Sequence, residues 1–257
     1  MACDDSTCYV ATATSLIAMP FTGSEADPVP PTAMRTASDQ PADYASAAAN
    51  LRALGPGETQ LVFAEGVAVA RGEVYVCDRA HHRVVVYNAA SLVPVRSFGA
   101  AWLPLPPMAP FPTPSAKMAW QPAELHSPEG IALLGAEAFV ADSCFRRVAV
   151  FEPNRGTYLR RVGPFEQEVR GVVAVPAGAS PLAHALLLVS SPTKVHVRLL
   201  HTGEPWQVVA IVGGGGLCWS PHEGKAYLMT DARNAGKGQF HVLRLQRLAE
   251  KRDRGGV

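Results

Sequence analysis

The sequence lacks the signatures of several protein classes. It contains no pair of cysteines separated by two residues, so neither a zinc ribbon nor a thioredoxin-like redox site is predicted. No apolar run approaches the roughly 18 residues that span a membrane. The start, MACDDSTCYV, has no basic leader followed by an apolar core. We therefore expect a soluble intracellular protein in the reducing cytoplasm, with no membrane insertion.

The chain also lacks a strong charge of either sign. Its formal net charge is +1 over 257 residues, which predicts no overall attraction to nucleic acid or to a membrane surface. The charge is unevenly spread, because residues 1–62 hold seven acidic and two basic side chains and residues 63–257 hold 15 acidic and 21 basic ones. This mild basic excess keeps RNA binding among the functions to consider.

A repeat is the main positive feature of the sequence. Residues 78–87 read DRAHHRVVVY, and residues 142–151, 64 positions later, read DSCFRRVAVF. Four pairs of residues share this offset: Gly66 and Gly130, Asp78 and Asp142, Arg83 and Arg147, and Gly99 and Gly163. A constant offset over four landmarks predicts two copies of one structural unit.

The repeated unit has the composition of a small antiparallel sheet. Residues 65–99 contain four short runs rich in β-branched and aromatic residues, separated by turns of Gly, Asn and charged residues. Residues 127–163 repeat this outline, and looser copies span residues 171–213 and 216–245. A partial trace occupies residues 8–23, and we expect it to pair with strands of the last unit.

Four-stranded units repeated in this way predict an all-β fold, a β-propeller, because radial packing buries both faces of each small sheet. The expected number of blades is five to six, either complete in this chain or completed by another chain. The Gly-Val-Ala-Val runs that open the units would form the innermost strands, where small residues suit close packing.

Composition divides the chain into three parts. Residues 1–62 form an irregular N-terminal segment with the partial blade and a linker rich in Pro and Ala. Residues 63–246 hold the propeller blades, and residues 247–257 form a basic C-terminal tail.

An insertion at residues 100–125 interrupts the blades. It contains seven prolines, with Trp102, Phe111 and Trp120 between them. Exposed aromatic and proline residues in a long loop can dock on a protein partner in an extended conformation, which makes these three residues candidates for partner binding. The alternative is that the tryptophans fold back and cover a propeller edge.

Two of the units resemble the NHL-repeat family, whose units read Pro-x-Gly-Ile-Ala-Val, then Val-Tyr-Val-Ala-Asp, then Asn-His-Arg-Val-x-Val-Phe, and end in Phe-Gly. The matching runs are 127–133 (SPEGIAL), 138–142 (AFVAD), 74–78 (VYVCD) and 81–87 (HHRVVVY). His82 stands at the histidine of the family pattern, whereas Arg146 stands there in the second copy. The specific resemblance covers these two units, and a diffuse one extends to residue 245.

The resemblance implies a propeller, commonly of six blades. Some related six-bladed propellers are peptidyl-hydroxyglycine amidating lyases or lactonases, whose sites need metal ligands that converge on a central channel. The residues near the starts of the blades that could serve are Glu65, Glu129, Glu168 and His126. A metal-dependent lyase or lactonase is therefore an alternative, although Glu65 and Glu129 directly precede structural glycines and face solvent equally well.

The histidines 81 and 82 beside Asp78 allow two interpretations. Two imidazoles and a carboxylate can bind a metal ion. In the other interpretation Asp78 accepts hydrogen bonds in the turn, and His82 and Arg83 brace the strand. Because Asp142 recurs with no histidine beside it, we favour the structural role and predict no metal, no cofactor and no catalytic residue.

RNA binding rests on cations in the turns. Arg79, Arg146 and Lys194 fall at similar positions in their units and could gather on one rim with His82, where they would contact phosphates. The resemblance adds that propellers of tripartite-motif proteins can bind single-stranded RNA on a basic face. The near-neutral net charge and the absence of a dense aromatic-basic alternation count against it.

Weighed together, these patterns favour a non-enzymatic propeller that acts as a protein-protein interaction scaffold or as a subunit of a larger assembly. Single-stranded RNA binding ranks second, and a metal-dependent lyase or lactonase ranks third.

Overall fold

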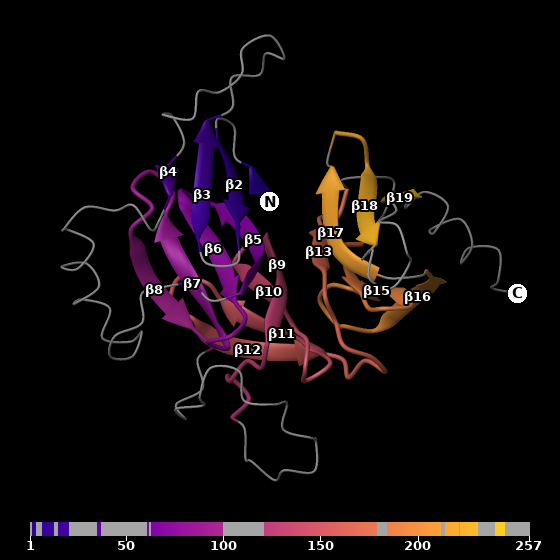
Figure 1. Ribbon diagram of the computed structural model, residues 1–257. Coiled ribbons are helices and arrows are strands. Elements are labelled where there is room, and N and C mark those ends of the chain that lie inside the picture. Colours follow the sequence, from indigo (N-terminus) through magenta and orange to yellow (C-terminus); the bar gives the residue numbers. More distant parts are fainter. Residues whose placement is uncertain are drawn as a thin grey trace, which may run out of the picture. The chain divides into compact units, whose positions relative to one another are not determined.

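The computed structural model describes residues 2–3, 7–12, 15–20, 35–36, 61, 63–99, 121–178, 184–211, 214–220, 222–230 and 240–244. Within these ranges the secondary structure consists of strands, and no helix is present that could cross a membrane. The strands form five antiparallel sheets, and the strands of each sheet lie side by side in chain order (Figure 1). The predicted all-β fold class is confirmed.

Sheets 1, 2 and 3 each contain four strands. Sheet 1 consists of β1 (Ala2–Cys3), β2 (Thr7–Ala11), β3 (Leu16–Pro20) and β4 (Arg35–Thr36). Sheet 2 consists of β5 (Ala64–Ala70), β6 (Glu73–Asp78), β7 (Arg83–Asn88) and β8 (Pro94–Phe98). Sheet 3 consists of β9 (Pro128–Leu134), β10 (Glu137–Asp142), β11 (Arg147–Glu152) and β12 (Thr157–Val162).

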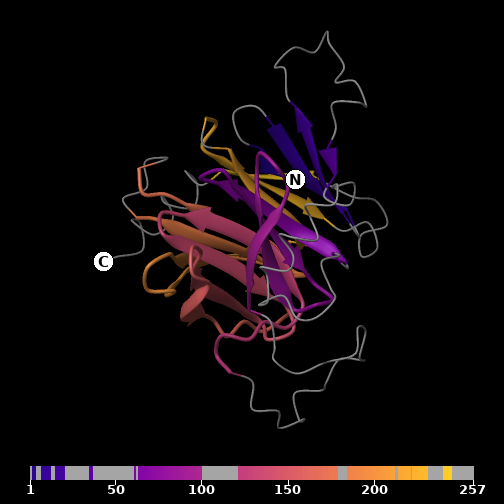
Figure 2. The same cartoon turned by 90° about the vertical axis from the view of Figure 1, so that its left-hand side faces the viewer.

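The last two sheets differ in size. Sheet 4 consists of β13 (Val172–Val175), β14 (Leu186–Ser190), β15 (Lys194–Leu199) and β16 (Pro205–Ala210). Sheet 5 has three described strands, β17 (Gly214–Ser220), β18 (Lys225–Thr230) and β19 (Phe240–Arg244). The strands of these two sheets are the orange to yellow arrows in Figure 2. Five consecutive meanders of this kind are the blades of a β-propeller, so the predicted architecture is confirmed.

The four sequence units correspond to sheets 2 to 5, but the N-terminal trace was placed wrongly. The described residues of this trace form β2 and β3, which pair with each other and with β1 and β4 in a sheet of their own rather than with strands of the last unit. Strands β1 and β4 are only two residues long, too short for an alternating pattern to be recognised. A disulfide joins Cys3 and Cys8, which stand directly opposite on β1 and β2.

The chain divides into two compact units. Unit 1 comprises Met1–Glu129 with Asn154–Tyr158, and unit 2 comprises Gly130–Pro153 with Leu159–Val257. Unit 1 therefore holds sheets 1 and 2, and unit 2 holds most of sheet 3 with sheets 4 and 5.

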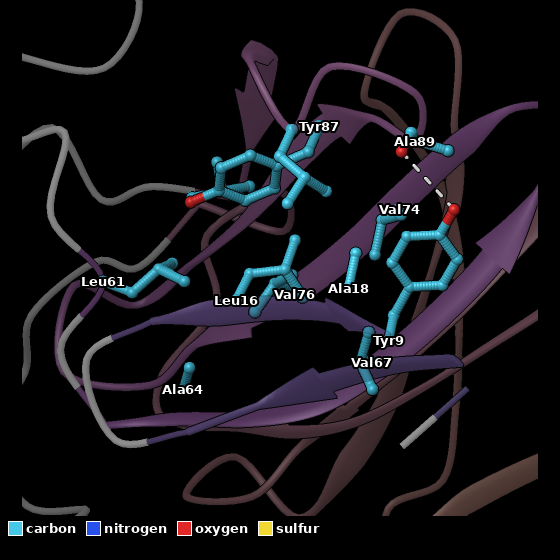
Figure 3. Close-up of a cluster of buried hydrophobic side chains, with 12 residues drawn as sticks. Tyr9, Leu16, Ala18, Leu61, Ala64, Val67, Val74, Val76, Tyr87 and Ala89 are labelled. Atoms are coloured by element: carbon cyan, nitrogen blue, oxygen red, sulfur yellow. Dashed lines mark hydrogen bonds between the residues drawn. The ribbon is translucent and has the colours of Figure 1, made fainter. Parts of the chain in front are cut away.

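The core of unit 1 lies between its two sheets. Tyr9 and Leu16 of sheet 1 pack with Val74, Val76 and Tyr87 of sheet 2, and all five are buried (Figure 3). The Tyr9 hydroxyl donates a hydrogen bond of 3.4 Å to the carbonyl oxygen of residue 89, which satisfies the polar end of a buried aromatic ring.

Unit 2 has two successive cores of the same type. One joins sheet 3 to sheet 4 through residues such as Val150 and Leu187, and the other joins sheet 4 to sheet 5 through residues such as Leu188 and Leu228. Alternate residues of β14 thus face sheet 3 and sheet 5. Such a strand, buried on both faces, reads as the continuous apolar run LLLVS.

Glycines allow the first strands of these sheets to approach closely. A Cβ atom on Gly130 would lie 2.6 Å from the carbonyl oxygen of Arg170, and one on Gly171 would lie 2.7 Å from the carbonyl oxygen of Gly215. Any larger residue would push the neighbouring backbone away. We expected small residues near the starts of these strands to allow close packing, and the short distances at Gly130 and Gly171 confirm this.

The 64-residue repeat is visible as repeated ion pairs. Arg83 Nε lies 2.8 Å from Asp78 Oδ2, and Arg147 Nε lies 2.7 Å from Asp142 Oδ2, with both carboxylates fully buried. Loss of one partner would leave a buried charge uncompensated, which explains why Asp and Arg recur together.

Candidate functional site

His82 lies in the turn between β6 and β7 and holds the segment that precedes β9. Its backbone is left-handed, with φ at 55°. Its ring stacks on His126, with 4.7 Å between centroids and 11° between planes, and its Nδ1 accepts a hydrogen bond of 3.0 Å from the backbone N–H of Ser127. No pattern in the sequence indicated this partnership, because the two histidines are 44 residues apart with an insertion between them.

Burial lowers the pKa of both stacked rings and so favours their neutral form. Desolvation and the neighbouring His126 and His81 lower the pKa of His82 to about 4, and desolvation lowers the pKa of His126. Asp78 acts in the opposite direction on His82 but does not outweigh burial. At neutral pH His82 therefore brings no positive charge for an anion, although RNA binding at this residue stays a prediction.

Asp78 is the centre of a compact polar cluster. Its Oδ2 lies 2.8 Å from both Arg83 Nε and His81 Nδ1. These contacts brace the turn. Among the described residues, no group of three or more His, Cys, Asp or Glu side chains is placed to hold a metal ion.

Arg79 pairs with two of the glutamates named for an enzymatic site. Its Nη1 lies 3.4 Å from Glu65 Oε1, and its Nη2 lies 3.4 Å from Glu129 Oε1. His126, another of the four residues named for that site, lies in the stack with His82. Within unit 1 the structure thus brings together Arg79, Glu65 and Glu129 as an ion-pair network.

The two remaining predicted cations meet in unit 2. Arg146 Nη1 donates to the carbonyl oxygen of Glu166 at 3.3 Å, and Lys194 Nζ pairs with the Glu166 carboxylate. The positive charge of Lys194 is partly offset by this carboxylate. The three candidates for partner binding in the insertion, Trp102, Phe111 and Trp120, lie outside the described residues.

Sequence reasoning missed an apolar surface on sheet 5. In the strand register Tyr227 stands opposite both Cys218 and Val242, so the three side chains share one face, and Met229 follows on that face two residues along β18. Met229 is 62% exposed and Val242 is 46% exposed. We call these four residues the outer face of sheet 5.

The outer face differs from its counterparts in unit 2. Phe139 and Val150, the equivalent cross-strand pair of sheet 3, are fully buried in the core shared with sheet 4. Leu188 and Val197 of sheet 4 are buried in the core shared with sheet 5. Strand β18 reads KAYLMT, apolar on both faces, which is the signal that could have indicated a second surface to be covered.

Comparisons with known proteins agree with the fold. Residues 61–87, which reach from just before β5 into β7, match the family model of the NHL repeat. Among solved structures, the chain resembles hydrazine synthase from Kuenenia stuttgartiensis, with a TM-score of 0.52 and 12% sequence identity over 75% of this chain and 50% of that chain. The chain thus spans half the length of that chain, and an identity this low shows the fold alone. No curated protein matches the chain.

The repeat seen in the sequence, the ion pairs at its landmark positions, the five antiparallel sheets and the family match all agree. The chain is a β-propeller, and its residues 61–87 match the NHL repeat.

Proposed function

We propose that the chain is a non-enzymatic protein-interaction scaffold, or a subunit of a larger assembly, that docks a protein partner on the outer face of sheet 5. The observation that supports this function is the exposure of Met229 and Val242 on a face whose counterparts in sheets 3 and 4 are buried. Contiguous exposed apolar side chains on a sheet mark a surface that gains free energy when it is covered.

The chemistry of this face favours a protein over a nucleic acid. Complete burial of a Met or Val side chain contributes roughly 1.5–3 kcal/mol, so two such residues with an adjacent tyrosine form a useful anchor. Lys225, at the end of the face, is paired with Glu223 at 3.2 Å. Single-stranded RNA requires several cations along its backbone as well as stacking rings, whereas the two most exposed side chains described on this face, Met229 and Val242, are aliphatic.

Co-purification with matched variants tests the proposal. The tagged full chain, a Met229→Glu and Val242→Glu double variant and a control with Val95→Glu and Leu159→Glu are isolated from native extract. The control residues are 42% and 46% exposed on β8 and β12, so both variants place two carboxylates at comparably exposed sites. We expect the face variant to lose at least about ten-fold of a partner that the control retains.

Ribonuclease treatment distinguishes the alternative function. Partners that survive ribonuclease and depend on Met229 and Val242 support a protein scaffold. A set that disappears with ribonuclease favours RNA binding instead, and equal retention by both variants contradicts docking at the outer face.

A further inference from the structure

Several arginines of the chain combine the same two contacts, an aromatic ring and a carboxylate. They are Arg96 with Tyr75 and Glu73, Arg147 with Phe145 and Asp142, and Arg160 with Phe139 and Glu137. The ring covers one face of the guanidinium, and the carboxylate accepts its N–H groups and offsets its charge. Within this protein, such arginines thus have an internal anion.

Arg198 on β15 has the ring without the carboxylate. Its guanidinium carbon lies 5.0 Å from the ring centre of Phe165, and its Nη1 donates to the carbonyl oxygen of Gly203 at 3.2 Å. In the described part of the chain, no carboxylate forms an ion pair with Arg198. Burial lowers the pKa of Arg198, because the guanidinium is partly desolvated and no anion compensates for this.

His196 precedes Arg198 on the same face of β15, since alternate residues of a strand share one face. It stands opposite Val189, which packs in the core shared with sheet 3. The His196 side chain is nearly buried, at 6% exposure, and its ring meets the edge of Phe165 with 5.0 Å between centroids. Its Nε2 has no hydrogen-bond partner among the described residues. A buried ring nitrogen in this state gains free energy from an added partner.

The charge around these two residues favours an anion. Lys194 is a third basic residue on this face, and it pairs with Glu166, whose side chain is 74% exposed. Burial lowers the pKa of His196, and the charges of Arg198 and Lys194 lower it further. Glu166 acts in the opposite direction but is the smallest of these effects. A ligand with negative charge would therefore relieve both Arg198 and His196.

We propose that Arg198 and His196 form a binding site for a carboxylate ligand on sheet 4. The guanidinium binds the carboxylate through its N–H groups, and the His196 ring turns to donate its Nε2–H to one oxygen. The ligand is either a small di- or tricarboxylate or an acidic side chain of a protein partner. The site lies on sheet 4, so this inference does not depend on docking at the outer face of sheet 5.

The chemistry of the site favours a carboxylate over a phosphate. A planar guanidinium matches a planar carboxylate through two parallel N–H contacts, and the arginines paired within this chain bind carboxylates. A phosphate dianion requires more positive charge, and Lys194 already pairs with Glu166. Val208, which stands opposite His196 on β16, is 51% exposed, so a ligand can approach from that strand.

Histidine-selective NMR of the full chain tests the site. The His196 ring resonance, identified by its loss in His196→Gln, is followed during titration with sodium succinate and with a blocked peptide that copies residues 135–140, GAEAFV. Ionic strength is held constant with sodium chloride. We expect a saturable shift of this resonance with a Kd of about 1–10 mM for at least one probe. The occupied site should also raise the pKa of His196 by at least about 0.5.

Arginine variants distinguish this site from a general effect of charge. Arg198→Gln should weaken binding at least about ten-fold. Arg161→Gln removes an exposed arginine from β12 of the same unit and should change binding by less than about two-fold. Arg198→Lys keeps the charge but loses the paired N–H contacts, so it should weaken binding by about three- to five-fold. If Arg198→Gln impairs folding, Arg198→Lys decides.

The two probes distinguish the sources of the carboxylate. Tighter binding of the peptide, abolished by Glu137→Gln in the peptide, assigns the site to an acidic side chain of a protein partner. Tighter binding of succinate assigns it to a small carboxylate.

Three results overturn the inference. They are the absence of a saturable shift up to about 50 mM of either probe, equal weakening of binding by Arg198→Gln and Arg161→Gln, and tighter binding of inorganic phosphate than of either carboxylate probe.

Discussion

The two best copies of the repeat differ at the position of His82. This residue joins the turn between β6 and β7 to the segment that precedes β9. In the second copy Arg146 takes the same left-handed conformation, with φ at 52°, and its carbonyl oxygen accepts a hydrogen bond from the N–H of Phe165. Both copies therefore use the last residue of this turn to hold the segment that leads to the following sheet.

The neutral histidine stack predicts acid sensitivity. The folded-state pKa of His82, about 4, lies below its ordinary value of 6.5, so the unfolded chain binds more protons between these values. Stability present above about pH 6.5 is thus lost as the pH falls toward 4. We expect the ring to contribute about 1 kcal/mol of this loss, because a partly exposed group is screened by solvent.

Urea unfolding at pH 7 and pH 4.5 measures this effect. His82→Asn keeps a residue that tolerates the left-handed backbone and removes the titrating ring, so the loss between the two pH values should shrink. His201→Asn, on an exposed turn, should leave the loss unchanged. A wild-type stability that is equal at both pH values would show that the stack does not disfavour protonation.

For single residues, the sequence indicated the role of a side chain better than it indicated which distant residue that side chain contacts. The recurrence of Asp78 at Asp142 indicated a structural carboxylate, and in both copies this carboxylate pairs with the arginine five residues later. The stack with His126 could not be read, since local pattern carries no information on contacts between distant segments.

Among the elements, the four units read from the sequence became sheets 2 to 5 because each contains strands of four to seven residues with regular turns. Sheet 1 was reduced to a partial trace, since two of its strands have two residues each. The repeat is also harder to recognise in sheet 4. There Ser190 and Val195 form the pair that Asp142 and Arg147 form in sheet 3, so no acidic residue marks the end of the second strand.

Close passage of β13 and β17 predicts unequal effects at two glycines. An added methyl group at Gly171 would lie 2.7 Å from the carbonyl oxygen of Gly215 and 2.8 Å from the backbone nitrogen of Leu217. Because the opposing atoms are backbone, Gly171→Ala should destabilise the chain by about 1–3 kcal/mol. Gly216→Ala meets no atom within 4 Å and should change stability by less than about 0.5 kcal/mol.

Thermal or urea unfolding of the two alanine variants provides the comparison. If both variants lost the same free energy of unfolding, the loss would come from replacing glycine by alanine and not from the close approach of the backbone near β13 to β17.

For the whole molecule, the fold was readable because composition, turn spacing and repeat period all indicated the same architecture. The function was less readable. The residue pattern of β18 is the same for a strand whose outer face is covered by another surface and for one whose outer face is exposed. The sequence therefore does not distinguish the two. The aromatic insertion, which the sequence offered as the partner-binding segment, keeps that role as a prediction.

Thiol reactivity tests the predicted compartment. In chain isolated without reductant, a maleimide should label exposed Cys218 and spare buried Cys77, whose pKa is raised by desolvation. Cys3 and Cys8 should react only after reduction, because they form a disulfide. Peptide mapping by mass spectrometry assigns each label.

Labelling of Cys3 and Cys8 before reduction would contradict the disulfide and fit the predicted reducing cytoplasm. Their protection would favour an oxidising compartment, where such bonds persist.

The sheets of unit 2 also follow one another in a single direction, with equivalent faces turned toward the next sheet. The pairs Phe139–Val150 of sheet 3 and Leu188–Val197 of sheet 4 lie on the face that packs against the next sheet, and Tyr227–Val242 is the pair at the same register position in sheet 5. Sheets 3 and 4 are extended on that side by their successors. A partner that packs on this face of sheet 5 would therefore present the kind of apolar strand pair that sheets 4 and 5 present to sheets 3 and 4.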